Sequence, residues 1–208
     1  MRSVALALVL AAPAAALAAT PLDSFLDGMK TLRATFVQTV TDAHAREIDR
    51  ASGTLIVERP GKFSWDIHPE GAAGSAGQLM VADGRNLWFF DRDLQQVTVK
   101  PVDAALSATP AMLLSGSVDI RKNFTIGTAG RREGLDWVLV QPRGAEADFR
   151  QALLGFSGGE LRRMVLDDKL GQTATVVFEH VERNGPVSPA EVSFTPPPGV
   201  DVIGTPKK

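Results

Sequence analysis

Gly155, Ser157 and Gly159 have the G-x-S-x-G spacing of the nucleophile elbow of serine hydrolases. That elbow needs a strand, a sharp turn and then a helix, so that the serine hydroxyl stands exposed above a parallel sheet. Residues 160–166 instead have the character of a second strand, which favours a hairpin turn at Ser157. His180 comes after Ser157 in the chain, as the histidine of a catalytic triad does in such hydrolases. A serine esterase therefore remains an alternative, ranked below the two functions considered at the end of this section.

Other arrangements of reactive side chains give no indication of catalysis or of a metal site. His44, His68 and His180 are far apart in the chain and belong to no metal-ligand motif. Gly61-Lys62 is not part of a phosphate-binding loop, because Ile56 occupies the position where such a loop has its first glycine. We therefore expect no enzyme activity, catalytic residue, metal or cofactor.

Apolar side chains are the remaining candidates for a functional surface. Phe36 and Val40 recur at even spacing, as do Phe63 and Trp65, and Trp88 lies in a later apolar run. The aromatic residues include no tyrosine, which suits an interior with few polar groups. Two interpretations stay open: a packed core, or an apolar ligand cavity between a sheet and covering helices.

Arg59 presents a similar choice, because it stands directly before the turn sequence Pro60-Gly61. Arginine at such a position is most often a solvated surface residue. Alternatively, its guanidinium donors could satisfy the free carbonyl groups at the end of a covering helix and hold a lid shut.

The hydrophobic period indicates the elements that would position these residues. Residues 21–32 carry apolar side chains at helical spacing, and the period then changes to two. Runs of strand character recur about every ten residues between turn sequences, which predicts an antiparallel meander that closes or nearly closes on itself. A short apolar helix at 109–114 interrupts it. The expected strands after Val40 are 62–67, 78–82, 86–90, 95–100, 124–128, 137–141, 149–156, 161–166, 173–182 and 191–194.

Length, charge and the N-terminal residues limit the class of protein. The chain has 208 residues, a formal net charge of -2 and no cysteine, so a nucleic-acid partner, a disulfide and a lipid-bearing cysteine are not expected. A positive start, an apolar run and the small-x-small sequence Ala16-Leu17-Ala18 predict a cleavable signal peptide over residues 1–18. Residues 19–208 are then expected to form a single exported domain.

Four segments resemble one known family in their order and spacing. They are Arg59–Trp65 (RPGKFSW), Val81–Asp91 (VADGRNLWFFD), Thr109–Leu114 (TPAMLL) and Phe194–Val200 (FTPPPGV). The chain is similar to the LolA family, the periplasmic outer-membrane lipoprotein carrier proteins of Gram-negative bacteria. The absence of an N-terminal cysteine favours the soluble carrier over the related lipid-anchored receptor.

The resemblance implies a mainly β fold, an incomplete, half-open antiparallel barrel covered by an α-helical lid. It implies an apolar cavity for the acyl chains of lipoproteins, with Arg59 as the latch of the lid. The implied partners of this expected monomer are acylated lipoproteins, an inner-membrane ABC-type lipoprotein-releasing complex and an outer-membrane lipoprotein receptor. The expected cavity residues are Leu26, Leu32, Phe36, Val40, Phe63, Trp65, Met80, Trp88, Met112 and Leu113.

Two departures from the family pattern affect the expected shape of the cavity. The 72–77 loop is longer than expected, and Ala111 stands where a bulky apolar residue is common, which predicts a looser lid contact. The alternative function is a periplasmic lipid- or lipoprotein-sensing protein of the same fold that retains its ligand instead of passing it on.

Overall fold

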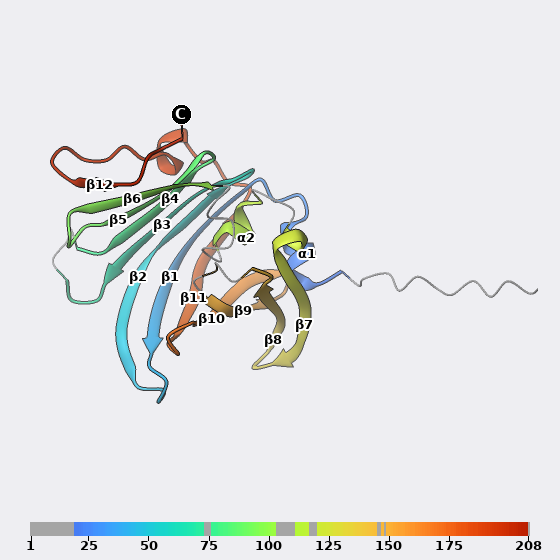
Figure 1. Cartoon of the computed structure of the whole chain (residues 1–208). Coiled ribbons are helices and arrows are strands. Elements are labelled where there is room, and N and C mark those ends of the chain that lie inside the picture. The colour runs from blue at the N-terminus through green and yellow to red at the C-terminus, as the bar shows by residue number, and fades with distance from the viewer. Residues whose placement is uncertain are drawn as a thin grey trace, which may run out of the picture.

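One antiparallel sheet dominates the computed structural model, which describes residues 19–72, 76–102, 111–116, 120–144, 147 and 149–207. Within these residues the sheet has twelve strands in the order β12-β6-β5-β4-β3-β2-β1-β11-β10-β9-β8-β7 (Figure 1). Neighbouring strands are antiparallel, except that β12 is parallel to β6. The strands are β1 Thr31–Thr41, β2 Glu47–Glu58, β3 Lys62–Pro69, β4 Gln78–Asp83, β5 Asn86–Asp91, β6 Gln96–Pro101, β7 Phe124–Arg132, β8 Leu135–Pro142, β9 Phe149–Ser157, β10 Glu160–Asp168, β11 Thr173–Arg183 and β12 Asp201–Ile203.

Several expectations concern residues outside this description. The expected signal peptide, residues 1–18, lies outside it, as do residues 73–75 of the loop and the expected helix start at Thr109-Pro110. The division of the chain into a signal peptide and one carrier domain therefore stays a prediction.

The helices of the described part are short: α1 Pro21–Leu26, α2 Ala111–Ser115, α3 Ile120–Asn123 and the 3-10 helix η2 Pro189–Val192. The expectation of a helix over residues 21–32 is wrong at its C-terminal end. Asp27 has an extended backbone and Gly28 a φ of 64°, so the chain leaves the helix after Leu26. Residue 32 already belongs to β1. Residues 191–194, expected as a strand, begin instead in η2.

The sheet curves without closing. β12 and β7 stand at the two ends of the strand order and do not pair with each other. Figure 1 shows the walls formed by β2–β6 and by β7–β10 facing each other, with α1 and α2 between them. The fold is therefore an open antiparallel half-barrel with helices on its concave side.

The strand register separates the apolar residues into two groups on opposite faces. Phe63 pairs with Ala82, which pairs with Leu87, and all three belong to the large buried cluster on the concave side. Trp88 pairs with Val81, and both belong to a smaller cluster on the other face. The expectation that Trp88 lines the same cavity as Phe63 is therefore wrong, because successive residues of β5 point to opposite faces.

The C-terminal segment covers this smaller cluster. The Phe194 ring lies 5.7 Å from the Trp88 ring and 5.9 Å from the Phe90 ring. Further along, β12 pairs with β6, and before it Glu191 forms an ion pair with Arg33 of β1 at 2.7 Å. Hydrogen bonds from Ser188 and Arg33 lower the pKa of Glu191 to about 2. The segment from η2 to β12 thus shields the convex face of β4–β6.

Phe194→Ala should lower the free energy of unfolding by about 1–3 kcal/mol, because Phe194 is half-buried between two aromatic rings. Urea unfolding followed by circular dichroism measures the change. Leu170→Ala is the control, since Leu170 is 86% exposed and should change the free energy by less than about 0.5 kcal/mol. Equal effects of the two substitutions would show that the C-terminal segment does not pack as described.

Candidate functional site

The concave face carries a continuous group of buried apolar side chains, here called the concave cluster. It is formed by α1, α2 and both walls of the sheet. Leu26, Leu32, Phe36, Phe63, Trp65, Met112 and Leu113, all expected at the site, belong to it. Its other members are Leu22, Phe25, Met29, Ala34, Leu55, Val57, Ala82, Leu87, Val102, Ala111, Leu114, Phe124, Val138, Val140, Ala147, Phe149, Ala152, Leu154, Phe156, Leu161, Met164, Val176 and Phe178.

Three of the expected residues lie elsewhere or at the margin. Met80 is half-buried and packs against the concave cluster from β4. Val40 is half-buried and lies on the same strand as Phe36, four residues further along β1. Trp88 lies on the opposite face of the sheet. The structure thus brings together Leu26, Leu32, Phe36, Phe63, Trp65, Met112 and Leu113, with Met80 at the margin, and leaves Val40 and Trp88 out of the concave cluster.

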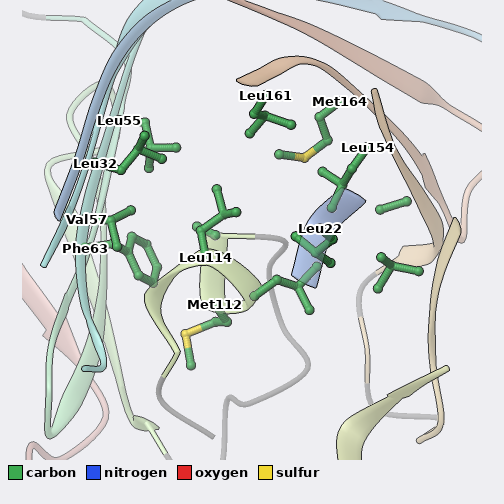
Figure 2. Close-up of a cluster of buried hydrophobic side chains, with 14 of the residues drawn as sticks. Leu22, Leu32, Leu55, Val57, Phe63, Met112, Leu114, Leu154, Leu161 and Met164 are labelled. Carbon is green, nitrogen blue, oxygen red and sulfur yellow. The ribbon is translucent and has the colours of Figure 1, made fainter. Parts of the chain in front are cut away.

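The second wall of the site was not expected from the sequence. Leu154, Leu161 and Met164 come from β9 and β10 and face Leu55 and Phe63 across the concave side (Figure 2). The sequence has alternating apolar residues in 149–156 and 161–166. The family resemblance, however, implies cavity residues only in the first half of the chain and in the α2 segment. The two walls face each other because the whole sheet curves. This curvature depends on pairing between strands that are far apart in the sequence.

Helix α2 lies between these walls. All five of its residues, Ala111 to Ser115, are fully buried. Figure 2 shows Met112 and Leu114 between the wall of Leu55 and Phe63 and the wall of Leu154. The expectation of a looser contact at Ala111 finds no support, since Ala111 is completely buried. A helix that is apolar on all sides is stable only when it is surrounded, so α2 fills the concave side.

Aromatic rings form a packed layer beside α2. The Phe36 and Trp65 rings meet edge to face at 5.6 Å, and Phe36 also contacts Phe178 at 6.4 Å. Gly53 on β2 provides the space for Phe36, because a Cβ at position 53 would lie 2.7 Å from the Phe36 Cζ and would also overlap the carbonyl oxygen of Asp66. The ring therefore lies directly over a glycine backbone.

Arg59 lies where α1 and α2 both end. Its Nη1 donates hydrogen bonds to the carbonyl oxygens of Leu26 at 2.8 Å and Met29 at 3.4 Å. The guanidinium also lies directly against Gly116, the residue after α2, where any side chain would collide with it. Two residues after Arg59, the backbone N–H of Gly61 donates to Ser115 of α2 at 2.8 Å. Arg59 thus binds carbonyl groups at the C-terminal end of α1, and α2 ends against its guanidinium.

The first turn of α1 is fixed by an acidic residue. Asp23 accepts hydrogen bonds from the backbone and hydroxyl of Thr20 at 2.7 and 2.8 Å, completing a capping box, and from Arg121 of α3 at 2.7 Å. Partial burial alone would raise the pKa of Asp23, but these hydrogen bonds outweigh it and lower the pKa below 3.8.

A second arginine contacts the other end of α1. Arg183 of β11 donates from Nη2 to the carbonyl oxygen of Asp27 at 3.1 Å, and its guanidinium lies 5.1 Å from the centre of the Phe25 ring. Together with Arg59 it satisfies carbonyl groups that follow the last turn of the helix. α1 is therefore held by directional polar contacts at both ends.

The sequence match to a nucleophile elbow lies in a β-hairpin. Ser157, Gly158 and Gly159 form the hairpin between β9 and β10, so a strand follows Ser157 instead of the helix that a nucleophile elbow needs. Among the described residues, no three His, Asp or Glu side chains are placed to hold a metal ion. In the same part of the chain, no helix has the length and apolar character required to cross a membrane.

An open antiparallel half-barrel with an apolar concave face occupied by helices is a fold suited to binding apolar ligands. The model of the family described as outer membrane lipoprotein carrier protein LolA matches residues 27–195, and the chain belongs to this family.

Relatives agree with this assignment over nearly the whole chain. The chain is 43% identical over 183 residues to the outer-membrane lipoprotein carrier protein of Dechloromonas aromatica, covering 88% of this chain and 86% of that one. It is 40% identical over 203 residues to the protein of the same name from Chromobacterium violaceum, covering 98% and 95%. An uncharacterized conserved protein from Thermus thermophilus has a similar fold, with a TM-score of 0.53 at 14% identity and coverage of 88% and 96%.

Asp23→Asn should lower the free energy of unfolding by about 1 kcal/mol at pH 7, through the weakened capping box and the lost ion pair with Arg121. Because folding lowers the pKa of Asp23, its contribution is complete above about pH 5 and is lost as the pH falls through 3.8 and below. The unfolding free energies of parent and variant should therefore converge in acid.

Urea unfolding at a series of pH values between 7 and 3 measures this convergence. Asp49→Asn, which removes an exposed carboxylate of β2, is the charge-matched control. A difference between Asp23→Asn and the parent that stays constant down to pH 3 would contradict the assigned role of the carboxylate.

Proposed function

We propose that this protein carries acylated lipoproteins through the periplasm and shields their acyl chains on the concave cluster. The observation that supports this most directly is the wholly buried α2 between two apolar walls. A short helix in this position occupies the space that hydrocarbon chains would occupy. The names of the relatives describe the same cargo.

The size of the hydrophobic effect explains why a carrier is needed. Each CH₂ group buried from water contributes about 0.8 kcal/mol, so an acyl chain of about sixteen carbons loses on the order of 12 kcal/mol when it is exposed. An acylated protein therefore does not cross an aqueous compartment alone. The carrier has to recover most of this free energy while holding the chains less tightly than the next acceptor does.

In this proposal the described structure is the closed state and α2 acts as the lid. Cargo chains displace α2 and take over its contacts with the walls. The net affinity is then the difference between two similar sets of apolar contacts, which keeps it moderate. We place release from an inner-membrane ABC-type complex before this step and transfer to an outer-membrane receptor after it, and we propose that the carrier acts as a monomer exported by its signal peptide.

Arg59 is proposed to act as the latch of the closed state. Its bonds to Leu26 and Met29 fix the end of α1, and its guanidinium forms the surface against which Gly116 ends α2. Hydrogen bonds from a charged donor are stronger than neutral ones and depend on geometry, so movement of the helices during cargo entry would break them. The latch thereby lowers the affinity for cargo and favours its release.

Two leucines that are both completely buried test whether α2 is displaced by cargo. Leu114→Ala in α2 and Leu154→Ala in β9 should each lower the free energy of unfolding by about 2–5 kcal/mol. In the loaded state α2 is displaced, so Leu114→Ala destabilises only the closed state. It should therefore raise the affinity for an acylated peptide about tenfold or more. Leu154→Ala should leave the affinity unchanged or lower it.

Fluorescence anisotropy of a labelled diacylated peptide measures both affinities, and urea unfolding verifies that both variants are folded. If Leu114→Ala and Leu154→Ala change the affinity in the same direction, α2 is part of the binding surface and is not displaced.

Arg59→Leu should bind cargo at least as tightly as the parent but pass it on poorly, because the bonds that favour the closed state are lost. The assay starts from a complex with a membrane-extracted lipoprotein and measures transfer after the outer-membrane receptor is added. Arg46→Leu is the matched control, since Arg46 is exposed in a hairpin turn and bonds only to Asp42 among the described contacts. Transfer by Arg59→Leu at the rate of the parent would overturn the latch.

The same assay separates the alternative functions. A carrier forms a soluble complex and passes the lipoprotein on, whereas a sensor retains it and an esterase cleaves an acyl group from it. Ser157→Ala should change none of these readings, because Ser157 ends β9 directly before the hairpin turn Gly158-Gly159 and is followed by a strand, not by the helix of a nucleophile elbow. Loss of acyl-group cleavage in this variant would reinstate the hydrolase interpretation.

A further inference from the structure

The three tryptophans differ in what their indole N–H groups bind. Nε1 of Trp88 donates to Oδ2 of Asp83 at 2.7 Å, and Nε1 of Trp137 donates to the carbonyl oxygen of Arg132 at 3.1 Å. Trp65 is only 7% exposed, and its Nε1 is fully buried without a hydrogen-bond partner in the part of the chain that the structure describes. Unpaired buried donors are rare in native proteins, so this one requires a physical explanation.

The surroundings of Trp65 explain why the donor stays unpaired. Its cross-strand neighbours are Leu55 on β2 and Met80 on β4, and its ring packs edge to face with Phe36. These side chains offer no oxygen acceptor. The backbone carbonyl groups of the central strands β2, β3 and β4 take part in the sheet ladder. Among the described residues, the N–H thus finds no hydrogen-bond acceptor.

Trp65 also lies at a boundary along the sheet. On β3, Phe63 before it is completely buried, whereas Ile67 after it is half-buried. On β1, Phe36 is buried, whereas Gln38 and Val40 beyond it are half-buried. On β1 and β3, Phe36 and Trp65 are therefore the last buried residues of the concave face before Gln38, Val40 and Ile67 become half-buried. An indole suits such a boundary, because it has an apolar body and one polar group.

We propose that the Trp65 N–H donates a hydrogen bond to an acyl carbonyl oxygen of the bound lipid, which rests on the proposed carrier function. The carbonyl that links an acyl chain to its head group is the one acceptor that necessarily enters the site with the chain. With that carbonyl at Trp65, the tail extends past Phe63 toward the buried end of the concave cluster, near Arg59. The head group stays on the more exposed side of Phe36 and Trp65, so Trp65 sets the depth of the chain.

This assignment makes the site sensitive to how the chains are attached. An ester or amide carbonyl accepts the hydrogen bond, whereas an ether-linked chain of the same length leaves the buried donor unpaired. The parent protein should therefore bind a peptide with two ester-linked palmitoyl chains roughly five- to tenfold more tightly than its analogue with two ether-linked hexadecyl chains.

The decisive variant is Trp65→Phe, which removes the N–H and keeps an aromatic ring. It should bind the ester and ether peptides with equal affinity, since both peptides then lack the hydrogen bond. Trp88→Phe and Trp137→Phe are matched controls, because their N–H groups are already satisfied within the protein. Both should keep the preference of the parent for the ester, as measured by fluorescence anisotropy of the labelled peptides.

A second measurement reports on the carbonyl itself. An ester peptide labelled with ¹³C at its carbonyl groups should show an infrared carbonyl band at lower frequency when bound to the parent protein than when bound to Trp65→Phe, because only the parent donates a hydrogen bond to the carbonyl in the apolar site. Equal binding of the two peptides by the parent, or an equal loss of both in Trp65→Phe, would overturn the role of the N–H and leave the carrier function intact. Binding of neither peptide by the folded parent would overturn the carrier function itself.

Discussion

A single curved sheet cannot shield its own apolar concave face, and the rest of this structure follows from that constraint. Domains normally bury such a face against a second layer. Here the strand order ends at β12 and β7 without closing, and the second layer within the described chain consists of α1 and α2. The stability of the concave side therefore depends on two helices of six and five residues, which are too short to be stable by themselves.

The two helices are held by different kinds of interaction. α1 has directional hydrogen bonds at both ends: the Asp23 carboxylate accepts from Thr20 at its start, and Arg59 and Arg183 donate to carbonyl groups at its C-terminal end. α2 is held mainly by burial of its apolar side chains, together with the backbone bond from Gly61 to Ser115. Hydrocarbon can replace apolar contacts, which have no preferred direction, but it cannot replace a hydrogen bond to a carbonyl. Of the two, α2 is therefore the helix that we propose an acyl chain displaces.

Short strands with period two predicted the mainly β fold from the sequence alone, whereas the resemblance to the family supplied the expected residues of one wall. The sequence did not predict β2, whose first four residues are exposed and mostly charged, nor which face Trp88 occupies, since β5 is apolar at four successive positions. The hydrophobic period also predicted a first helix that reaches Leu32, whereas the chain leaves the helix after Leu26 and Gly28 has a positive φ. The second wall from β9 and β10 depends on the curvature of the whole sheet, and local periodicity carries no information on curvature.

The balance between holding and releasing a chain depends on the few polar groups at the edges of the apolar surface. If acyl chains take the place of α2, most wall contacts are present in both states and largely cancel from the free-energy difference. What does not cancel is the set of directional interactions that exist in only one state. In our proposal, the hydrogen bonds of Arg59 at the end of α1 belong to the closed state, and the unpaired Trp65 N–H gains its partner only in the loaded one. A small number of hydrogen bonds thus decides an equilibrium whose large apolar contributions nearly cancel.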